Sequence, residues 1–285
     1  MNEPTKAEYL PIDKLHPFEG HPFKVIDNEE MDRLVWSVVT QGVLTPLVVR
    51  PMENGEYEVI SGHRRLYACQ KAEIDKVPAL IYALDRDAAA IALVDSNLHR
   101  EHILPSEKAF AYKLKADALN HQGQRTDLTS VQVAPKLSTD VIAQDAGTSK
   151  DTVKRYIRLT NLQPPILQMV DEGKIALTPA VELSYLKQEE QLGLVDAIEA
   201  NDCTPSLSQA IQMKKLSQEN LLTKDRIDEI TSQEKANQRE KISFRVEDIR
   251  GYFPRGYTSA QMVKEILQAL QQRQRRRKGR DLDGR

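Results

Sequence analysis

Residues 62–65, Gly-His-Arg-Arg, follow a strand predicted over residues 57–60 and begin a predicted helix. A strand–glycine–helix turn presents free backbone N–H groups, and the side chains of Arg64 and Arg65 add forked donors. This combination suits a phosphate or pyrophosphate group. Arginine pairs at a helix start are also common on ordinary protein surfaces, so the segment alone is a weakly specific signal.

Two neighbouring segments add weight through their order along the chain. Residues 42–50, GVLTPLVVR, form a turn and a strand upstream of the arginines. Residues 96–101, SNLHRE, lie downstream. There the amide of Asn97 could help to hold a metal-bound triphosphate, and Arg100 supplies a further cation. Each segment alone is a weak signal, and the order and spacing of the three carry the weight.

A second pattern, over residues 139–159, predicts a helix-turn-helix. Ala143 is small where two helices cross, Gly147 supplies the turn, and Val153 lies on the inner face of the second helix. Thr148 and Asp151, three residues apart, form a capping-box signature that begins this second helix.

The second helix of this pattern, residues 149–160, carries four basic residues and one acidic residue. Such a helix suits phosphate attraction and base contact in a major groove, with the residues near its N-terminus closest to the bases. The alternative is a helical hairpin with a solvated charged face, but spacing, capping and charge agree on DNA binding. The DNA-contact candidates are Ser149, Lys150, Thr152, Lys154, Arg155 and Arg158.

Periodicity places these motifs in an α+β N-terminal domain followed by an all-α helix-turn-helix domain and a small C-terminal strand–helix segment. A helix over residues 29–41 has one apolar face and ends at Gly42. Short strands and helices then alternate as far as residue 119. The predicted divisions are a domain over 8–119, a linker over 120–137, the DNA-binding domain over 138–216, a polar linker or solvated helix over 217–240, and a dimerisation segment with a basic tail over 241–285.

Composition limits the class of protein. A chain of 285 residues has room for two or three domains, and no apolar run reaches the ~18 residues of a membrane span. Two cysteines cannot build a disulfide scaffold, and a buried structural role is the expectation for Cys69. His99 and His102 lack a third ligand at suitable spacing, so surface roles are expected for both. We expect a soluble cytoplasmic protein, associated with a nucleoid or a plasmid.

The ordered set of motifs resembles the ParB/RepB partition-protein family over about residues 8–200. Residues 42–50 resemble the family's first nucleotide box, 62–65 its Gly-Glu-Arg-Arg box, and 96–107 its Glu-Asn-x-x-Arg…Leu-x-Pro-x-Glu box. The resemblance implies a CTP-dependent DNA clamp that loads at a specific, palindromic site on double-stranded DNA. It also implies a homodimer acting in chromosome, plasmid or mobile-element partition with a Walker-type ATPase as its partner.

The resemblance also assigns roles to single residues. Arg64 and Arg65, with Gly62 and His63, would contact phosphates; Asn97 would hold Mg²⁺ and the triphosphate; and Arg100 would support the pocket. The base end would be shaped by Gly42, Thr45 and Pro46.

Two positions depart from the family pattern. His63 stands where the family has Glu before the arginines, and Ser96 stands where the family has a Glu associated with hydrolysis. Asp95 is adjacent, but a shift of one residue turns a helical side chain by about 100°. We therefore expect CTP binding, and CTP hydrolysis is in doubt.

The C-terminal region contains a strand-like run, residues 242–246, and an amphipathic helix from residue 259. The apolar face of this helix must pack, and dimerisation is favoured over packing on its own chain. The last fifteen residues hold six arginines and one lysine against two aspartates. Such a tail either adds salt-sensitive DNA contacts or remains a solvated terminus.

Two rival functions remain at this point. A transcriptional regulator or nucleoid-occlusion factor would use the same scaffold, and would differ in binding sites and partners. A small-molecule enzyme is the rival from another class, because ParB-like N-terminal folds also resemble sulfiredoxin and small-molecule kinases. The helix-turn-helix, and the lack of a cysteine in residues 62–65, argue against the enzyme.

Overall fold

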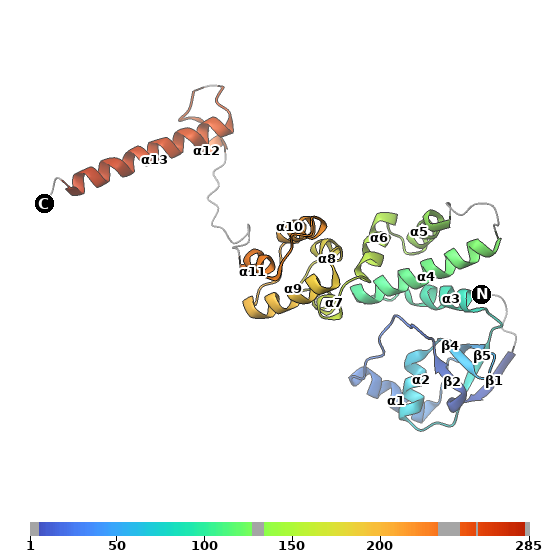
Figure 1. The fold of residues 1–285 in the computed structure, drawn as a ribbon. Helices are drawn as coiled ribbons and strands as arrows, with labels where there is room; N and C mark the ends of the chain where they lie inside the picture. The colour runs from blue at the N-terminus through green and yellow to red at the C-terminus, as the bar shows by residue number, and fades with distance from the viewer. Residues whose placement is uncertain (1–5, 127–133, 233–245, 255, 283–285) are drawn as a thin grey trace. The chain divides into compact units, whose positions relative to one another are not determined.

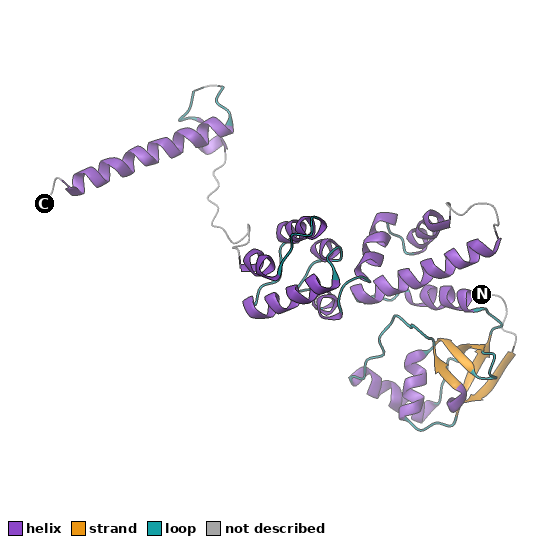
Figure 2. Cartoon of the chain, viewed as in Figure 1, coloured by secondary structure: helices purple, strands orange, loops and turns teal. Residues whose placement is uncertain are grey.

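The computed structural model describes residues 6–126, 134–232, 246–254 and 256–282. The chain forms two compact units, Met1–Gln233 and Glu234–Arg285. In the first unit, a mixed α+β part precedes an all-α part (Figures 1 and 2), which confirms the expected fold class for these two domains. The elements of the α+β part are β1 (Lys6–Pro11), the short 3-10 helix η1 (Ile12–Lys14), β2 (Leu15–Pro17), α1 (Glu29–Gln41), β3 (Leu47–Pro51), β4 (Tyr57–Ser61), α2 (His63–Lys71), β5 (Lys76–Ile81) and α3 (Arg86–Asn97).

The all-α part begins with a long helix, α4, on which the next two helices pack. Its elements are α4 (Pro105–Thr126), α5 (Ala134–Asp145), α6 (Lys150–Leu159), α7 (Pro164–Asp171), α8 (Leu177–Leu183), α9 (Gln188–Asn201), α10 (Leu207–Gln218) and α11 (Lys224–Ser232). The second unit contains α12 (Val246–Arg250) and α13 (Ser259–Leu282).

The five strands form one mixed sheet in the order β1-β5-β3-β4-β2. The pairs β1–β5 and β3–β4 are antiparallel, whereas β5–β3 and β4–β2 are parallel. Both faces of this sheet are covered. Neighbouring residues of a strand point to opposite faces, so Val59 joins the core beneath α1 and α2, while Ile60 packs with Leu93 of α3.

Local signals set the ends of the helices that border the sheet. Asn28 accepts a hydrogen bond from the Met31 N–H at 3.1 Å and so begins α1. Gly42 ends α1 at φ +74°, a conformation that glycine adopts at little cost. Both ends of α1 lie where the sequence predicts them.

The helix-turn-helix packs on the middle of α4. Tyr112 and Ala116 of α4 form one buried cluster with Ile142 and Ala143 of α5 and with Val153 of α6. A second and larger cluster contains residues from every helix between α6 and α11. Because α4 contacts α3 as well as α5 and α6, it connects the sheet domain to the helix-turn-helix.

The structure differs from the predicted linkers. Helix α4 continues to Thr126, so the first part of the expected 120–137 linker is helical, and residues 127–133 lie outside the described residues. Helix α11 buries Ile227 and Ile230 in the all-α core, so residues 224–232 belong to that domain. The polar composition of this segment did not indicate a core helix, because only two or three residues of a short helix face the core.

The C-terminal predictions fall partly outside the described residues. Residues 242–245 of the expected strand are among those not described, and Val246 begins helix α12 instead. Helix α13 reaches Leu282, although the side chains of the basic tail, residues 273–282, are not described. None of the helices among the described residues combines the length and apolarity needed to cross a bilayer.

Candidate functional site

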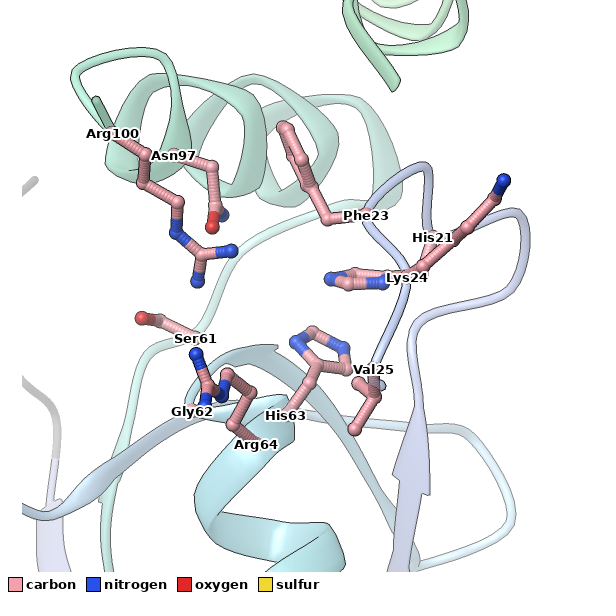
Figure 3. Close-up of a pocket in the computed structure, with 10 residues that line it drawn as sticks. All are labelled: His21, Phe23, Lys24, Val25, Ser61, Gly62, His63, Arg64, Asn97 and Arg100. Atoms are coloured by element: carbon pink, nitrogen blue, oxygen red, sulfur yellow. The ribbon is translucent and has the colours of Figure 1, made fainter. Parts of the chain in front are cut away.

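A small pocket lies where β4 turns into α2, beneath the end of α3 (Figure 3). Five sequence candidates line it, Gly62, His63, Arg64, Asn97 and Arg100. The other lining residues are His21, Phe23, Lys24, Val25 and Ser61. Segments about 40 residues apart in the chain thus meet in one place. The pocket has a volume of about 20 Å³, room for one water molecule, so a larger ligand requires the side chains at its mouth to move outward.

Gly62 caps the N-terminus of α2 in a left-handed conformation, with φ +106° and ψ +21°. A Cβ here would lie 3.1 Å from Leu47 Cγ and 3.1 Å from Arg65 Nη2. Glycine is therefore required both by the backbone conformation and by the close approach of β3. No side chain caps this end of α2, so its first N–H groups face the pocket with the positive end of the helix dipole.

Two arginines point toward each other across the pocket, Arg64 from α2 and Arg100 from the turn after α3 (Figure 3). Partial burial, followed by repulsion from Arg64, lowers the pKa of Arg100. Glu30 of α1 contacts Arg64 from outside at 3.1 Å. The ten lining residues include no carboxylate. The charged side chains that line the pocket are therefore all cationic, which favours an anion as the ligand.

Asn97 is held in position at the end of α3. Its side-chain N–H group donates to the Leu93 carbonyl at 2.7 Å and to Ser96 Oγ at 3.1 Å. Because a carbonyl only accepts hydrogen bonds, this contact identifies the amide nitrogen. The amide oxygen then points into the pocket (Figure 3), and it is a suitable ligand for a hard cation such as Mg²⁺.

Four other candidates lie away from the pocket lining. Arg65 donates to the Thr45 carbonyl and, at 2.8 Å, to the Pro46 carbonyl. Its guanidinium therefore holds the turn before β3, and burial lowers its pKa. Gly42, Thr45 and Pro46 form that turn and do not line the pocket. Adjacent arginines on a helix point about 100° apart, so only Arg64 reaches the pocket.

Two histidine rings in close contact, tilted by 34° to each other, form one wall. The rings of His21 and His63 lie 3.7 Å apart between centroids, and His63 Nε2 accepts a hydrogen bond from the Phe18 N–H at 3.3 Å. Burial, with smaller effects from His21 and Arg100, lowers the pKa of His63 to about 3. Burial likewise lowers the pKa of His21 to about 4. Both rings are neutral at pH 7 and add no fixed charge to the pocket.

Sequence reasoning missed the contribution of the loop over residues 18–28. His21, Phe23 and Lys24 reach the pocket because Glu107, at the start of α4, accepts hydrogen bonds from the Lys24 N–H at 2.8 Å and the Leu104 N–H at 3.0 Å. The only sequence feature that points to this loop is a His-Pro pair at residues 16–17 and another at 21–22. By themselves these pairs indicate only that prolines shape a loop.

The residues at the position of the family's hydrolytic glutamate are engaged elsewhere. Asp95 forms an ion pair with Lys115 of α4, and Ser96 Oγ donates to the Leu93 carbonyl at 2.9 Å. Neither residue lines the pocket. Across the described residues, no group of three or more His, Cys, Asp or Glu is arranged to hold a metal ion. Cys69 is buried in the sheet domain, as expected of a structural thiol.

The helix-turn-helix has a cap different from the predicted one. Ser149, not Thr148, begins α6, and its Oγ accepts from the Thr152 N–H at 3.1 Å. Ser149 Oγ also lies 2.9 Å from Thr152 Oγ1, so these two candidates first serve the cap. Gly147 adopts φ +59° in the turn, and Ala143 and Val153 are buried between the helices.

The basic candidates of α6 divide into two groups. Lys150, Lys154 and Arg155 are exposed, and Lys150 Nζ lies 2.8 Å from Asp140 of α5. Arg158 has a different role. Its guanidinium donates to the Ser184 hydroxyl and carbonyl, both at 3.2 Å, and lies 3.9 Å from the centre of the Tyr185 ring. Arg158 therefore connects α6 to the end of α8. The exposed basic surface of α6 consists of Lys150, Lys154 and Arg155.

Two family models match the chain, the ParB N-terminal domain over residues 2–98 and the ParB HTH domain over residues 115–212. A protein described as "probable chromosome 1-partitioning protein ParB" from Deinococcus radiodurans is 30% identical over 213 residues, which are 74% of this chain and 67% of that protein. The chain belongs to the ParB family.

Other ParB relatives carry a different description. A nucleoid occlusion protein of Listeria innocua is 34% identical over 194 residues, 67% of this chain and 62% of its own length. A nucleoid occlusion protein of Listeria monocytogenes is 33% identical over 187 residues, 65% of this chain. Only 59% of that relative's own length is matched.

Solved ParB structures show weaker similarity. The Caulobacter crescentus ParB complexed to its centromeric parS site is 22% identical, with a TM-score of 0.41, covering 79% of this chain and 98% of that one. The same organism's ParB complexed with CTP-gamma-S is 26% identical, with a TM-score of 0.32, covering 68% and 99%. With TM-scores below 0.5, the family assignment stands on the sequence matches.

Proposed function

We propose that this protein binds specific sites on double-stranded DNA through α6, and that it binds CTP with Mg²⁺ in the pocket at the start of α2. One observation carries the proposal. Arg64 and Arg100 converge on an uncapped helix N-terminus, with no carboxylate among the lining residues, in the unit that also contains an exposed basic helix. A triphosphate is the kind of ligand that this excess of cations and N–H donors favours.

Asn97 fits a role in holding the metal. Mg²⁺ usually retains several waters and is bound through substrate phosphates with only one or two protein oxygens. The single amide oxygen that faces the pocket meets this requirement. Magnesium would supply charge neutralisation for the phosphate chain, while Arg64, Arg100 and the α2 amides orient it.

Membership of the ParB family supports a larger proposal. In a homodimer, CTP binding would close the N-terminal domains around DNA and form a sliding clamp, with a Walker-type ATPase as the partner in partition. Turnover of CTP is not part of this proposal, because Asp95 pairs with Lys115 and Ser96 points to Leu93. We expect CTP to be bound and to remain intact.

Calorimetric titration tests the nucleotide site. The expected result is that CTP with Mg²⁺ binds more tightly than ATP, GTP or UTP, and that the Arg64→Ala and Asn97→Ala variants each bind about tenfold or more weakly. Arg33→Ala, on the exposed surface of α1, is the matched control. Equal binding of all four triphosphates contradicts the CTP assignment. Rapid release of phosphate on incubation contradicts the expected lack of turnover.

Salt-dependent DNA binding tests the role of α6. Lys150→Ala with Arg155→Ala removes two phosphate or base contacts, and is expected to lower the magnitude of the salt slope by about 1.8 and the specific affinity sharply. Lys113→Ala, exposed on α4, is the matched control and should bind like the wild type. Unchanged affinity of the double variant contradicts the assignment.

Nucleoid occlusion is a second candidate function, favoured by the description of several relatives. It requires the same DNA-binding chemistry and differs in the distribution of sites. Chromatin immunoprecipitation separates the two. Signal that spreads around one locus indicates partition, whereas many dispersed sites indicate nucleoid occlusion or regulation.

A further inference from the structure

Lys24 stands between two cavities. It lines the nucleotide pocket together with Arg64 and Arg100, and it also lines a larger apolar cavity of about 710 Å³ between the start of α4 and α7. Its backbone is fixed by the hydrogen bond from its N–H to Glu107 Oε1 at 2.8 Å. Its side chain can take more than one direction, because a lysine has four rotatable methylene groups and is 58% exposed here.

The ammonium of Lys24 points away from the pocket toward Asp171, at the end of α7. The distance from Nζ to Asp171 Oδ2 is 3.3 Å. The Asp171 side chain is only 8% exposed, and the start of α4 holds it firmly. Its carboxylate accepts from the Ser106 N–H at 2.9 Å and from the Ser106 Oγ at 2.6 Å. Asp171 therefore keeps its partners even when Lys24 leaves.

Charge balance gives the ammonium two alternative positions. Without an anion, the pocket already holds the repelling pair Arg64 and Arg100, so a third cation is better placed beside Asp171. A bound triphosphate brings several negative charges and reverses the preference. The existing ion pair is partly exposed and therefore weak, so its loss opposes the exchange only slightly.

We propose that Lys24 is a further phosphate ligand and that its ammonium transfers from Asp171 to the phosphate chain when the nucleotide binds. This inference rests on the proposed nucleotide site and names a coupling within it. Loss of the Lys24–Asp171 contact removes the ion pair that joins the loop over residues 18–28 to the helix-turn-helix domain. Nucleotide binding thereby loosens one connection between the sheet domain and α7.

Reciprocal coupling makes the transfer measurable. If Asp171 competes with the phosphates for Lys24, then removing the Asp171 charge must tighten nucleotide binding, and only while Lys24 is present. Asp171→Asn suits this test because its amide oxygen can still accept from the Ser106 N–H. Glu172→Gln is the matched control, since Glu172 borders the same cavity but pairs with Lys174 at 2.7 Å.

The experiment is calorimetric titration of CTP with Mg²⁺ into the full chain and four variants, with melting temperatures recorded for each. We expect Lys24→Met to bind about fivefold or more weakly. Asp171→Asn should bind about two- to fivefold more tightly, and Glu172→Gln like the wild type. The double variant Lys24→Met/Asp171→Asn should match Lys24→Met alone, because Asp171 acts through Lys24.

Three outcomes overturn the inference while leaving the proposed function intact. They are wild-type affinity in Lys24→Met, wild-type affinity in Asp171→Asn, and tightening by Asp171→Asn that persists in the double variant. The last result would mean that Asp171 acts on the ligand through its general field and not through Lys24. A wild-type chain that binds no triphosphate overturns the proposed nucleotide site itself, and the inference with it.

Discussion

Gly62 illustrates how one residue serves both the fold and the site. It combines φ +106° with a close approach to Leu47 and Arg65, and it exposes the α2 amides to the pocket. Its neighbour Arg65 turns away to hold the turn at Thr45 and Pro46. In a motif of four consecutive residues, Gly62, His63 and Arg64 therefore line the pocket, whereas Arg65 holds a neighbouring turn.

Gly62→Ala tests the structural demand at this position. The added Cβ meets Leu47 and strains the backbone, so we expect the free energy of unfolding to fall by about 1–3 kcal/mol. Gly55→Ala is the control, because Gly55 has φ +80° but no atom within 4 Å of the place an added methyl group would take, and only the backbone cost applies. Equal losses in the two variants, measured by urea unfolding, would show that the contact with Leu47 costs nothing.

The neutral histidine pair predicts a pH dependence of stability. The unfolded chain takes up protons on these residues near the ordinary pKa of 6.5, whereas the folded pair has pKa values of about 4 and about 3. The unfolded state thus binds more protons in this range. The free energy of unfolding should decrease as the pH falls from 6.5 toward 3, and the contribution is fully present above 6.5.

Urea unfolding at about pH 7 and about pH 5 measures this effect. His63→Asn should reduce the difference between the two pH values, since one of the two titrating groups is lost. Lys113→Ala, at an exposed position on α4, should leave the difference unchanged. An unchanged difference in His63→Asn would contradict the assignment of a neutral buried ring.

At the scale of elements, helix α4 holds the first unit together through a buried lysine. Lys115 is 1% exposed and pairs with Asp95 of α3 and, at 2.6 Å, with Asp145 of α5. The two carboxylates are 47% and 43% exposed. The charges are therefore unequal in their access to water: the lysine depends on its partners, and each aspartate can be solvated without it.

This asymmetry predicts an order of stabilities. Asp95→Asn/Asp145→Asn leaves the buried ammonium unpaired and should cost about 3–5 kcal/mol of unfolding free energy. Lys115→Met leaves two solvated carboxylates and an apolar side chain of similar length, and should cost less than about 2 kcal/mol. Lys113→Met, exposed on the same helix, serves as the control. The reverse order in denaturant unfolding would contradict the argument.

At the scale of the whole molecule, α13 carries an exposed apolar stripe. Val263, Leu267 and Leu270 follow i, i+4, i+7 spacing and are 55%, 54% and 55% exposed. This spacing is typical of a coiled-coil seam, and a second copy of the helix is the partner that the expected homodimer provides.

Leu267→Glu places a charge in this seam and should convert a dimer to a monomer of 32.3 kDa. Light scattering at micromolar concentration measures the mass. Gln268→Glu, on the adjacent face, should remain dimeric and controls for the added charge. A wild-type chain that is monomeric at this concentration contradicts the prediction directly.

Several features of this protein could be predicted from the sequence alone. Helix α1 and the basic face of α6 depend on residues within about four positions of one another, where periodicity and capping act. Each of the three boxes is a short continuous segment, and their order follows directly along the chain. The family resemblance came from the same local motifs.

Tertiary structure decided which side chains meet in the site. It turned Arg65 away from the pocket, brought in His21 and Lys24, and engaged Asp95 with Lys115 and Arg158 with Tyr185. These choices depend on contacts between residues far apart in the chain, such as Arg65 with Pro46 and His21 with His63. A side chain's direction is set by the partners that the fold places beside it, and no local pattern specifies those partners.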